Sequence, residues 1–153
     1  MRPAVLSLGS NIEDRMAHLR IGIEVLRPSV VSPVYESEPW GGVEQAPFLN
    51  VVVLAPLGAA AAWRAAQDAE ARAGRVRDGT RWGPRTLDVD VVTASGVDPA
   101  LVLPHPHAHE RAFVLQPWLD VEPHAELPGY GSIAVLAARL SGQVRRRDDL
   151  VLA

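Results

Sequence analysis

The sequence predicts an α+β domain of the ferredoxin-like type, in which an antiparallel sheet is flanked by helices and a three-layer α/β/α arrangement can form. Between residues 4 and 92 the predicted elements follow the order strand, helix, strand, strand, helix, strand, which is the split βαβ pattern. The predicted strands are apolar or alternate with period two, whereas the predicted helices repeat at helical spacing. No internal repeat or linker divides the chain, so we expect one domain over residues 1–153.

The first three elements follow from local signals. Residues 4–9 form an apolar run that is typical of a buried strand. A helix is expected next, because Ser10 or Asn11 can cap its first turn and Pro28 ends it. Residues 29–37 then predict a second strand. The apolar stripe of the helix consists of Met16, Leu19, Ile23 and Leu26.

The next elements are separated by two long loops. A strand is predicted from Phe48 to Ala55, after a segment rich in Gly and Pro. The Ala-rich residues 59–73 predict a strong helix that Gly74 terminates. A strand over residues 87–92 follows a loop rich in arginine. Two short helices, over residues 110–119 and 132–140, complete the prediction.

Composition excludes several classes of protein. The chain has no cysteine, so a metal ion can be held only by Asp, Glu or His. All fifteen basic residues are arginine, which excludes a Walker-type loop and a lysine Schiff base. The net charge of -3 argues against nucleic-acid binding, and no apolar run is long enough to span a membrane. The amino-terminal residues look like a strand rather than a signal segment, so we expect a cytoplasmic protein.

The strand over residues 87–92 carries the main chemical signal. Leu87, Val89 and Val91 are expected on one face of this strand, and Asp88 and Asp90 on the other. Two aspartates at positions i and i+2 have Cα atoms about 6.5 Å apart and point the same way, so their carboxylates can share a pair of divalent metal ions. Oxygen ligands of this kind suit Mg²⁺, which takes its other ligands from water and phosphates. The pair therefore indicates a magnesium site for a phosphate substrate.

The loop before this strand is strongly basic. Guanidinium groups bind phosphate oxygens in pairs, so a basic loop beside two carboxylates matches a metal-bound phosphate. Two other interpretations stay open on charge alone. The arginines can form a solvated loop, and the two aspartates can lie on a solvated sheet face. The basic residues in question are Arg72, Arg75, Arg77, Arg81 and Arg85.

Four blocks of sequence resemble the 6-hydroxymethyl-7,8-dihydropterin pyrophosphokinase family. In chain order they are Leu8-Gly9-Ser10-Asn11, the segment from Tyr35 to Pro47-Phe48-Leu49-Asn50, Arg81-Trp82-Gly83-Pro84-Arg85-Thr86-Leu87-Asp88-Val89-Asp90, and Leu103-Pro104-His105-Pro106 followed by Glu110-Arg111-Ala112-Phe113-Val114-Leu115. They cover most of residues 5 to 123 in the family's order. The resemblance implies transfer of pyrophosphate from ATP to 6-hydroxymethyl-7,8-dihydropterin, which gives the pterin diphosphate and AMP in folate biosynthesis.

The resemblance also implies roles for particular residues. Asp88 and Asp90 match the family's magnesium ligands, for which two ions are expected, and Asp88 also matches a pterin contact. Arg75 and Arg85 match catalytic residues that hold the phosphates. The implied ATP-binding residues are Gln67, Glu70, Arg75, Arg77, Arg81, Trp82, Arg85, Val91, His105 and Arg111. The implied pterin-binding residues are Ser37, Glu38, Trp40, Phe48, Asn50, Trp82, Asp88 and Phe113.

Several of these assignments agree with the chemistry of the residue types. Trp82 and Phe113 can stack on the two faces of a flat pterin, and the Asn50 amide offers both a donor and an acceptor. Glu70 can equally pair with an arginine of the basic loop. Asp78 is a departure from the family, because it adds an acidic residue beside the phosphates.

Three alternatives compete with this function. The run His105, His107 and His109 can be interpreted as a zinc site, but only His105 falls on the family motif. A metal-dependent phosphohydrolase would use Asp88 and Asp90 without any pterin. A binding module would hold the ligands and transfer nothing. We expect small-molecule substrates, no nucleic-acid or membrane partner, and a monomer.

Overall fold

One antiparallel sheet forms the centre of the domain in the computed structural model, which describes residues 2–38, 46–74 and 86–152. Its strands lie in the order β5-β1-β4-β3-β8, and β2 pairs with β4 beside β3. Every pair in the sheet is antiparallel, as predicted. These strands are β1 (Ala4–Ser10), β2 (Val30–Val31), β3 (Tyr35–Ser37), β4 (Phe48–Ala55), β5 (Asp88–Thr93) and β8 (Val144–Arg146).

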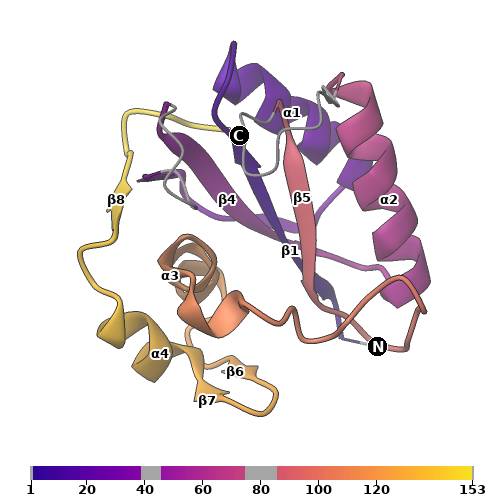
Figure 1. Cartoon of the computed structure of the whole chain (residues 1–153), viewed down its shortest axis with the longest axis vertical. Coiled ribbons are helices and arrows are strands. Elements are labelled where there is room, and N and C mark those ends of the chain that lie inside the picture. The colour runs from indigo at the N-terminus through magenta and orange to yellow at the C-terminus, as the bar shows by residue number, and fades with distance from the viewer. Residues whose placement is uncertain (1, 39–45, 75–85, 153) are drawn as a thin grey trace.

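Helices cover both faces of the sheet, so the domain has three layers (Figure 1). One face carries α1 and α2, and the other carries α3 and then α4. A 3-10 turn, η1, precedes α3, and a small hairpin of β6 and β7 precedes α4. The bounds are α1 (Arg15–Leu26), α2 (Ala59–Arg72), η1 (Ala108–Glu110), α3 (Ala112–Val121), β6 (Glu126–Leu127), β7 (Gly131–Ser132) and α4 (Ile133–Arg139).

The alternation of side chains along each strand fills two separate cores. In β1, Leu6 and Leu8 pack with Leu19 under α1 and α2. Val5 points the other way and packs with Trp118 of α3. Because helices cover both faces, β1 and β4 are buried along nearly their whole length. Within the described residues, no helix has an apolar stretch long enough to cross a membrane.

The first helix begins later than the sequence indicates. Asp14, rather than Ser10 or Asn11, is the N-cap of α1, and its carboxylate accepts a hydrogen bond from the Ala17 N–H at 3.0 Å. The prediction of the cap was wrong because β1 continues to Ser10 and Asn11 is used elsewhere. The Asn11 side-chain N–H donates to the Ala46 carbonyl oxygen at 3.1 Å.

The expected strand over residues 29–37 is divided into β2 and β3. Pro33 lies at the break, and proline has no N–H to donate to a neighbouring strand. The Ser32 hydroxyl accepts from the Val52 N–H at 2.9 Å there, so a side chain replaces a main-chain acceptor.

The helix α2 and its end at Gly74 agree with the prediction, and Gly74 has a positive φ of 72°. The strands β6, β7 and β8 were not predicted.

Tyr35 ties the sheet to α3. Its buried hydroxyl donates to the Asp120 carboxylate at 2.5 Å. Burial, followed by this hydrogen bond and the charge of Asp120, raises the pKa of Tyr35 to about 12. The neutral phenol is therefore the form that the folded protein prefers.

Replacement of Tyr35 by Phe should lower the free energy of unfolding by about 1 kcal/mol, because a buried hydrogen bond is lost. Folding raises the pKa of Tyr35, so the neutral phenol stabilises the folded protein at pH values below the unfolded pKa of about 10. This contribution to the free energy of unfolding is lost as the pH rises through the folded pKa of about 12. Urea unfolding at pH 8 and at pH 11.5 should show the difference between the two proteins shrinking at the higher pH. The exposed Tyr130, changed to Phe, is the control, and an unchanged difference at both pH values would contradict the assignment.

Candidate active site

The candidate site lies on the sheet face that α3 covers. Gly9 of β1 pairs with Asn50 of β4 on one side and with Asp88 of β5 on the other. The next row on the same face pairs Ser7 with Asp90. Directly paired residues on neighbouring strands project to the same face. The register therefore brings the amide of Asn50 from β4 and the two carboxylates of β5 onto one surface, on either side of β1.

The placement of the two aspartates agrees with the sequence prediction. Leu87, Val89 and Val91 are 0%, 5% and 3% exposed and belong to the core under α1 and α2. Asp88 and Asp90 are only partly buried and alternate with them along β5. Both carboxylates therefore project from the opposite face, toward the side of the sheet that carries α3.

Two further predicted residues converge on Asp90. An Nη1 atom of Arg111, at the start of α3, lies 3.5 Å from Asp90 Oδ2. The Nε2 atom of His105 lies 4.0 Å from Asp90 Oδ1. Arg111 also places its guanidinium carbon 5.4 Å from the centroid of the Phe113 ring, within the range of a cation–π contact. The structure thus brings together Asp90, His105, Arg111 and Phe113, which are up to 23 positions apart in the sequence.

His105 is neutral at neutral pH. Burial and the nearby Arg111 guanidinium lower its pKa to about 4, while the Asp88 carboxylate acts in the opposite direction. The Nδ1 atom of His105 accepts a hydrogen bond from the His107 N–H at 3.2 Å. The neutral ring therefore carries its proton on Nε2, the nitrogen that faces Asp90.

The Asn50 side chain is fixed by two hydrogen bonds. Its Nδ2 donates to the Ser37 hydroxyl at 2.8 Å and to the Tyr35 carbonyl at 3.3 Å. Gly9 lies directly against this amide, because the Asn50 and Phe48 side chains fill the space that a Cβ atom would take. A Cβ atom at Gly9 would lie 3.1 Å from Asn50 Oδ1 and 3.3 Å from Phe48 Cδ1, which is closer than most Cβ contacts. Asn50, Phe48 and Gly9 are therefore neighbours.

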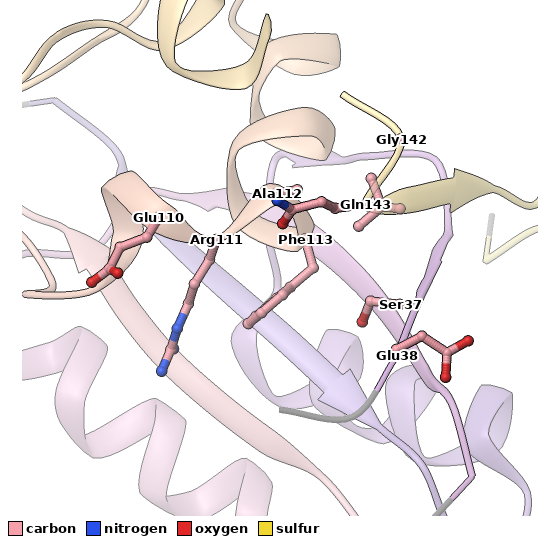
Figure 2. Close-up of a pocket in the computed structure, with 9 residues that line it drawn as sticks. Ser37, Glu38, Glu110, Arg111, Ala112, Phe113, Gly142 and Gln143 are labelled. Atoms are coloured by element: carbon pink, nitrogen blue, oxygen red, sulfur yellow. The ribbon is translucent and has the colours of Figure 1, made fainter. Parts of the chain in front are cut away.

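A pocket of about 360 Å³ opens between the sheet and the start of α3 (Figure 2). Three residues that were predicted to contact the pterin, Ser37, Glu38 and Phe113, line this pocket together with Arg111. Figure 2 shows the Phe113 ring between Arg111 on one side and Ser37 on the other. Sequence reasoning missed the remaining lining residues, which are Glu110, Ala112, Gly142, Gln143 and Val144.

The helix α2 contributes to the site through Glu70. Its Oε2 atom accepts a hydrogen bond from the Val89 N–H at 2.9 Å, so Glu70 holds the strand segment between the two aspartates. This contact was not among the roles predicted for Glu70. Gln67 is exposed on the same helix. The side chain of Val91 points into the core, so only its main chain is available for the predicted nucleotide contact.

Part of the predicted site lies outside the described residues. This applies to two predicted pterin contacts, which are both tryptophans, and to the arginines of the basic loop, so their roles stay predictions. The residues are Trp40, Arg75, Arg77, Arg81, Trp82 and Arg85.

The histidines after His105 are used in other ways. His107 Nδ1 lies 3.2 Å from a Glu110 carboxylate oxygen at the surface. The His109 ring stacks on Tyr130, with the ring centroids 4.1 Å apart. Over residues 2–38, 46–74 and 86–152, no group of three or more His, Asp or Glu side chains is placed to hold a metal ion. The zinc interpretation of the three histidines therefore has no support in this part of the chain.

The two aspartates fit a magnesium site that is completed by a substrate. They are oxygen ligands on one face of a strand and are accessible from that side. Mg²⁺ is commonly held by one or two carboxylates, with the remaining ligands supplied by water and phosphate oxygens. Arg111 and His105 flank Asp90 and limit how its carboxylate can turn.

The chain belongs to the family of 7,8-dihydro-6-hydroxymethylpterin-pyrophosphokinases, whose match covers residues 5–123. A 2-amino-4-hydroxy-6-hydroxymethyldihydropteridine pyrophosphokinase of Mycobacterium tuberculosis is 49% identical over an alignment of 144 residues, and the match covers 83% of this chain and 76% of that protein. A protein of the same name from Bacillus subtilis is 36% identical over 129 residues, 77% of each chain.

Solved structures show the same fold. The crystal structure of wild-type HPPK-DHPS from Plasmodium falciparum with SDX-DHP superposes with a TM-score of 0.71 over 95% of this chain, at 12% identity. An HPPK-DHPS in complex with substrates gives a TM-score of 0.67 over the same share, at 10% identity. This chain spans 47% of the length of each, or about half.

The substitution Asn50→Asp tests the geometry of the buried amide. The contact with the Tyr35 carbonyl would become repulsive, because a carboxylate oxygen would face that carbonyl oxygen at about the present 3.3 Å, whereas the Ser37 hydroxyl could donate to the new carboxylate. We expect a loss of about 1–3 kcal/mol in the free energy of unfolding, measured in urea at pH 7. Ser37→Ala removes only one acceptor and should cost less. An Asn50→Asp variant that is as stable as the unchanged protein would contradict this arrangement.

Proposed function

We propose that this chain transfers the pyrophosphoryl group of ATP to the hydroxymethyl group of 6-hydroxymethyl-7,8-dihydropterin, a step of folate biosynthesis. The observation that supports this most directly is the placement of Asp88 and Asp90 on the face that also carries Asn50, in a chain that belongs to this family. The products are the pterin diphosphate and AMP.

The pterin is assigned to the pocket at the start of α3. A fused, flat ring offers two faces for stacking, and Phe113 provides one aromatic surface in this pocket. The Asn50 amide and the Phe48 ring lie against Gly9 of the neighbouring strand, on the same face of the sheet. Because the Asn50 Nδ2 is already bonded to Ser37 and Tyr35, its oxygen is the atom offered to the pterin edge.

The nucleotide is assigned to the carboxylate side of the same face. Magnesium, with two ions held by Asp88 and Asp90, would neutralise charge on the phosphate oxygens. Arg111 adds a guanidinium beside Asp90, where it can stabilise charge on a transferring phosphate. His105 is neutral and can donate a hydrogen bond from Nε2 without adding charge.

The reaction is an in-line displacement at the β-phosphorus. The pterin hydroxyl oxygen forms the new bond to this phosphorus, and the bond from the β-phosphorus to the oxygen bridging to the α-phosphate breaks. AMP leaves with that oxygen, and the hydroxyl proton passes to solvent. Such transfers depend mainly on positioning and charge stabilisation, so no residue is assigned as an obligatory base. A cytoplasmic location and a monomeric state stay predictions.

Asp90→Ala should reduce AMP formation by about a thousandfold or more, because it removes a metal ligand and the partner of Arg111. AMP is measured by chromatography with ATP, the pterin and Mg²⁺ all present. Asp68→Asn, at an exposed ion pair with Arg72 on α2, is the matched control and should stay within twofold of the unchanged protein. Turnover by the Asp90 variant near the normal rate would overturn the two-carboxylate site.

Omitting one component at a time separates the rival functions. AMP should form only when ATP, the pterin and Mg²⁺ are present together, and chelation of the metal should stop the reaction until Mg²⁺ is added in excess. Release of phosphate from ATP alone would favour a phosphohydrolase. Binding of the pterin without any AMP would favour a binding module.

A further inference from the structure

One carboxylate on β3 is held by arginines of the carboxy-terminal strand. Glu36 pairs directly with Arg145 across β3 and β8. Its Oε1 atom accepts a hydrogen bond from Arg145 Nη2 at 2.6 Å, and its Oε2 atom accepts one from Arg147 Nη1 at 2.8 Å. The Arg145 hydrogen bond is the largest of the influences that lower the pKa of Glu36. Glu36 therefore stays ionised and binds both arginines at neutral pH.

A third arginine links Glu36 to the segment that precedes β4. Arg15, at the start of α1, lies 3.8 Å from Glu36 Oε2. The same Nη1 atom donates to the Pro47 carbonyl oxygen at 3.0 Å, directly before Phe48. The Glu36 carboxylate is 19% exposed, so these contacts are less screened than those of a fully exposed ion pair. Together they form a network rather than an isolated surface pair.

These contacts hold one wall of the pocket at the start of α3. Ser37 and Val144 pair in the β3–β8 ladder, and Gly142 and Gln143 continue the lining from the amino-terminal side of Val144. Figure 2 shows Gly142 and Gln143 bordering the same hollow as Ser37 and Phe113. The strand β8 has three residues and lies at the edge of the sheet, so its main-chain pairing with β3 is short.

We propose that Glu36 is a positioning residue for the pterin pocket, because it fixes the wall formed by residues 142–144 through Arg145 and Arg147. This inference rests on the proposed function, which assigns the pterin to this pocket. Glu36 itself does not line the pocket. Its effect reaches the substrate through the distance between the wall and the Phe113 ring.

Glu36→Gln keeps the shape of the side chain and removes its charge. We expect the KM for the pterin to rise by about three- to tenfold. This size is expected because the variant loses charge-assisted hydrogen bonds that solvent partly screens. The kcat and the KM for ATP should stay within about twofold, since Asp88 and Asp90 are not touched. Steady-state kinetics with each substrate varied in turn measures this division.

Asp149→Asn is the matched control. Asp149 also binds Arg147, through two hydrogen bonds of 2.9 and 2.7 Å, but it lies on the same segment as that arginine, two positions away, rather than on β3. The pterin KM of this variant should therefore equal that of the unchanged protein. An equal rise in both variants would show that any lost ion pair has the same effect and would overturn the proposal.

A double-mutant cycle tests the route of the effect. Arg145→Gln should raise the pterin KM in the same direction as Glu36→Gln, and the double variant should show less than the product of the two single effects. Arg145 is largely exposed, so we expect its variant to fold. The Arg145 variant therefore still tests the proposal if Glu36→Gln fails to fold. Independent, multiplying effects would contradict action through this pair.

The outcomes separate this inference from the function on which it rests. If the unchanged protein forms no AMP from ATP and the pterin, the proposed function fails. If the unchanged protein is active and Glu36→Gln has the same pterin KM, the proposed function stands and the positioning role fails. A lower melting temperature of the Glu36 variant with an unchanged pterin KM would also overturn the positioning role.

Discussion

The pairing of β1 with both β4 and β5 is the constraint on which the rest of the domain depends. It places Asn50, Gly9 and Asp88 in one row across three strands. Because side chains alternate with period two, a slip of one residue in β5 would turn both aspartates into the apolar core. Burial of Leu87, Val89 and Val91 on the opposite face fixes this register. The same hydrophobic packing that stabilises the sheet therefore orients the candidate metal ligands.

The two faces of the sheet differ in polarity. The face under α1 and α2 is closed by apolar side chains, and Gly22 of α1 lets the helix approach β1 so closely that a Cβ atom would lie 2.5 Å from Leu8 Cδ2. The face under α3 is apolar only over part of its area, around Val52 and Trp118. The remainder carries the polar row and the pocket. A rigid, fully packed face thus supports a polar face at which substrates can bind.

Charge on the polar face is distributed among a small number of residues. Asp90 has a guanidinium on one side and a neutral imidazole on the other, so a carboxylate and a cation are presented together. A phosphate bound to a metal ion requires both kinds of group. Away from Asp90, the Glu36 carboxylate accepts hydrogen bonds from Arg145 and Arg147. Arginine is the only basic residue of the chain apart from histidine, and it pairs with a carboxylate in both places.

The sequence by itself determined the order of the elements up to β5, apart from the division of one expected strand into β2 and β3, and the side of the strand from which Asp88 and Asp90 project. These features follow from local periodicity, which residues at i and i+2 set without any distant contact. Only the tertiary structure decided that Arg111 and His105 meet Asp90, that Glu70 binds the Val89 N–H, and that residues 142–144 close the pocket. Each of these depends on which strands and helices become neighbours, and on their register. The pattern of the three-residue β8 is too short to indicate which strand it pairs with. Its partner is β3, more than a hundred positions earlier in the chain, where Glu36 binds Arg145.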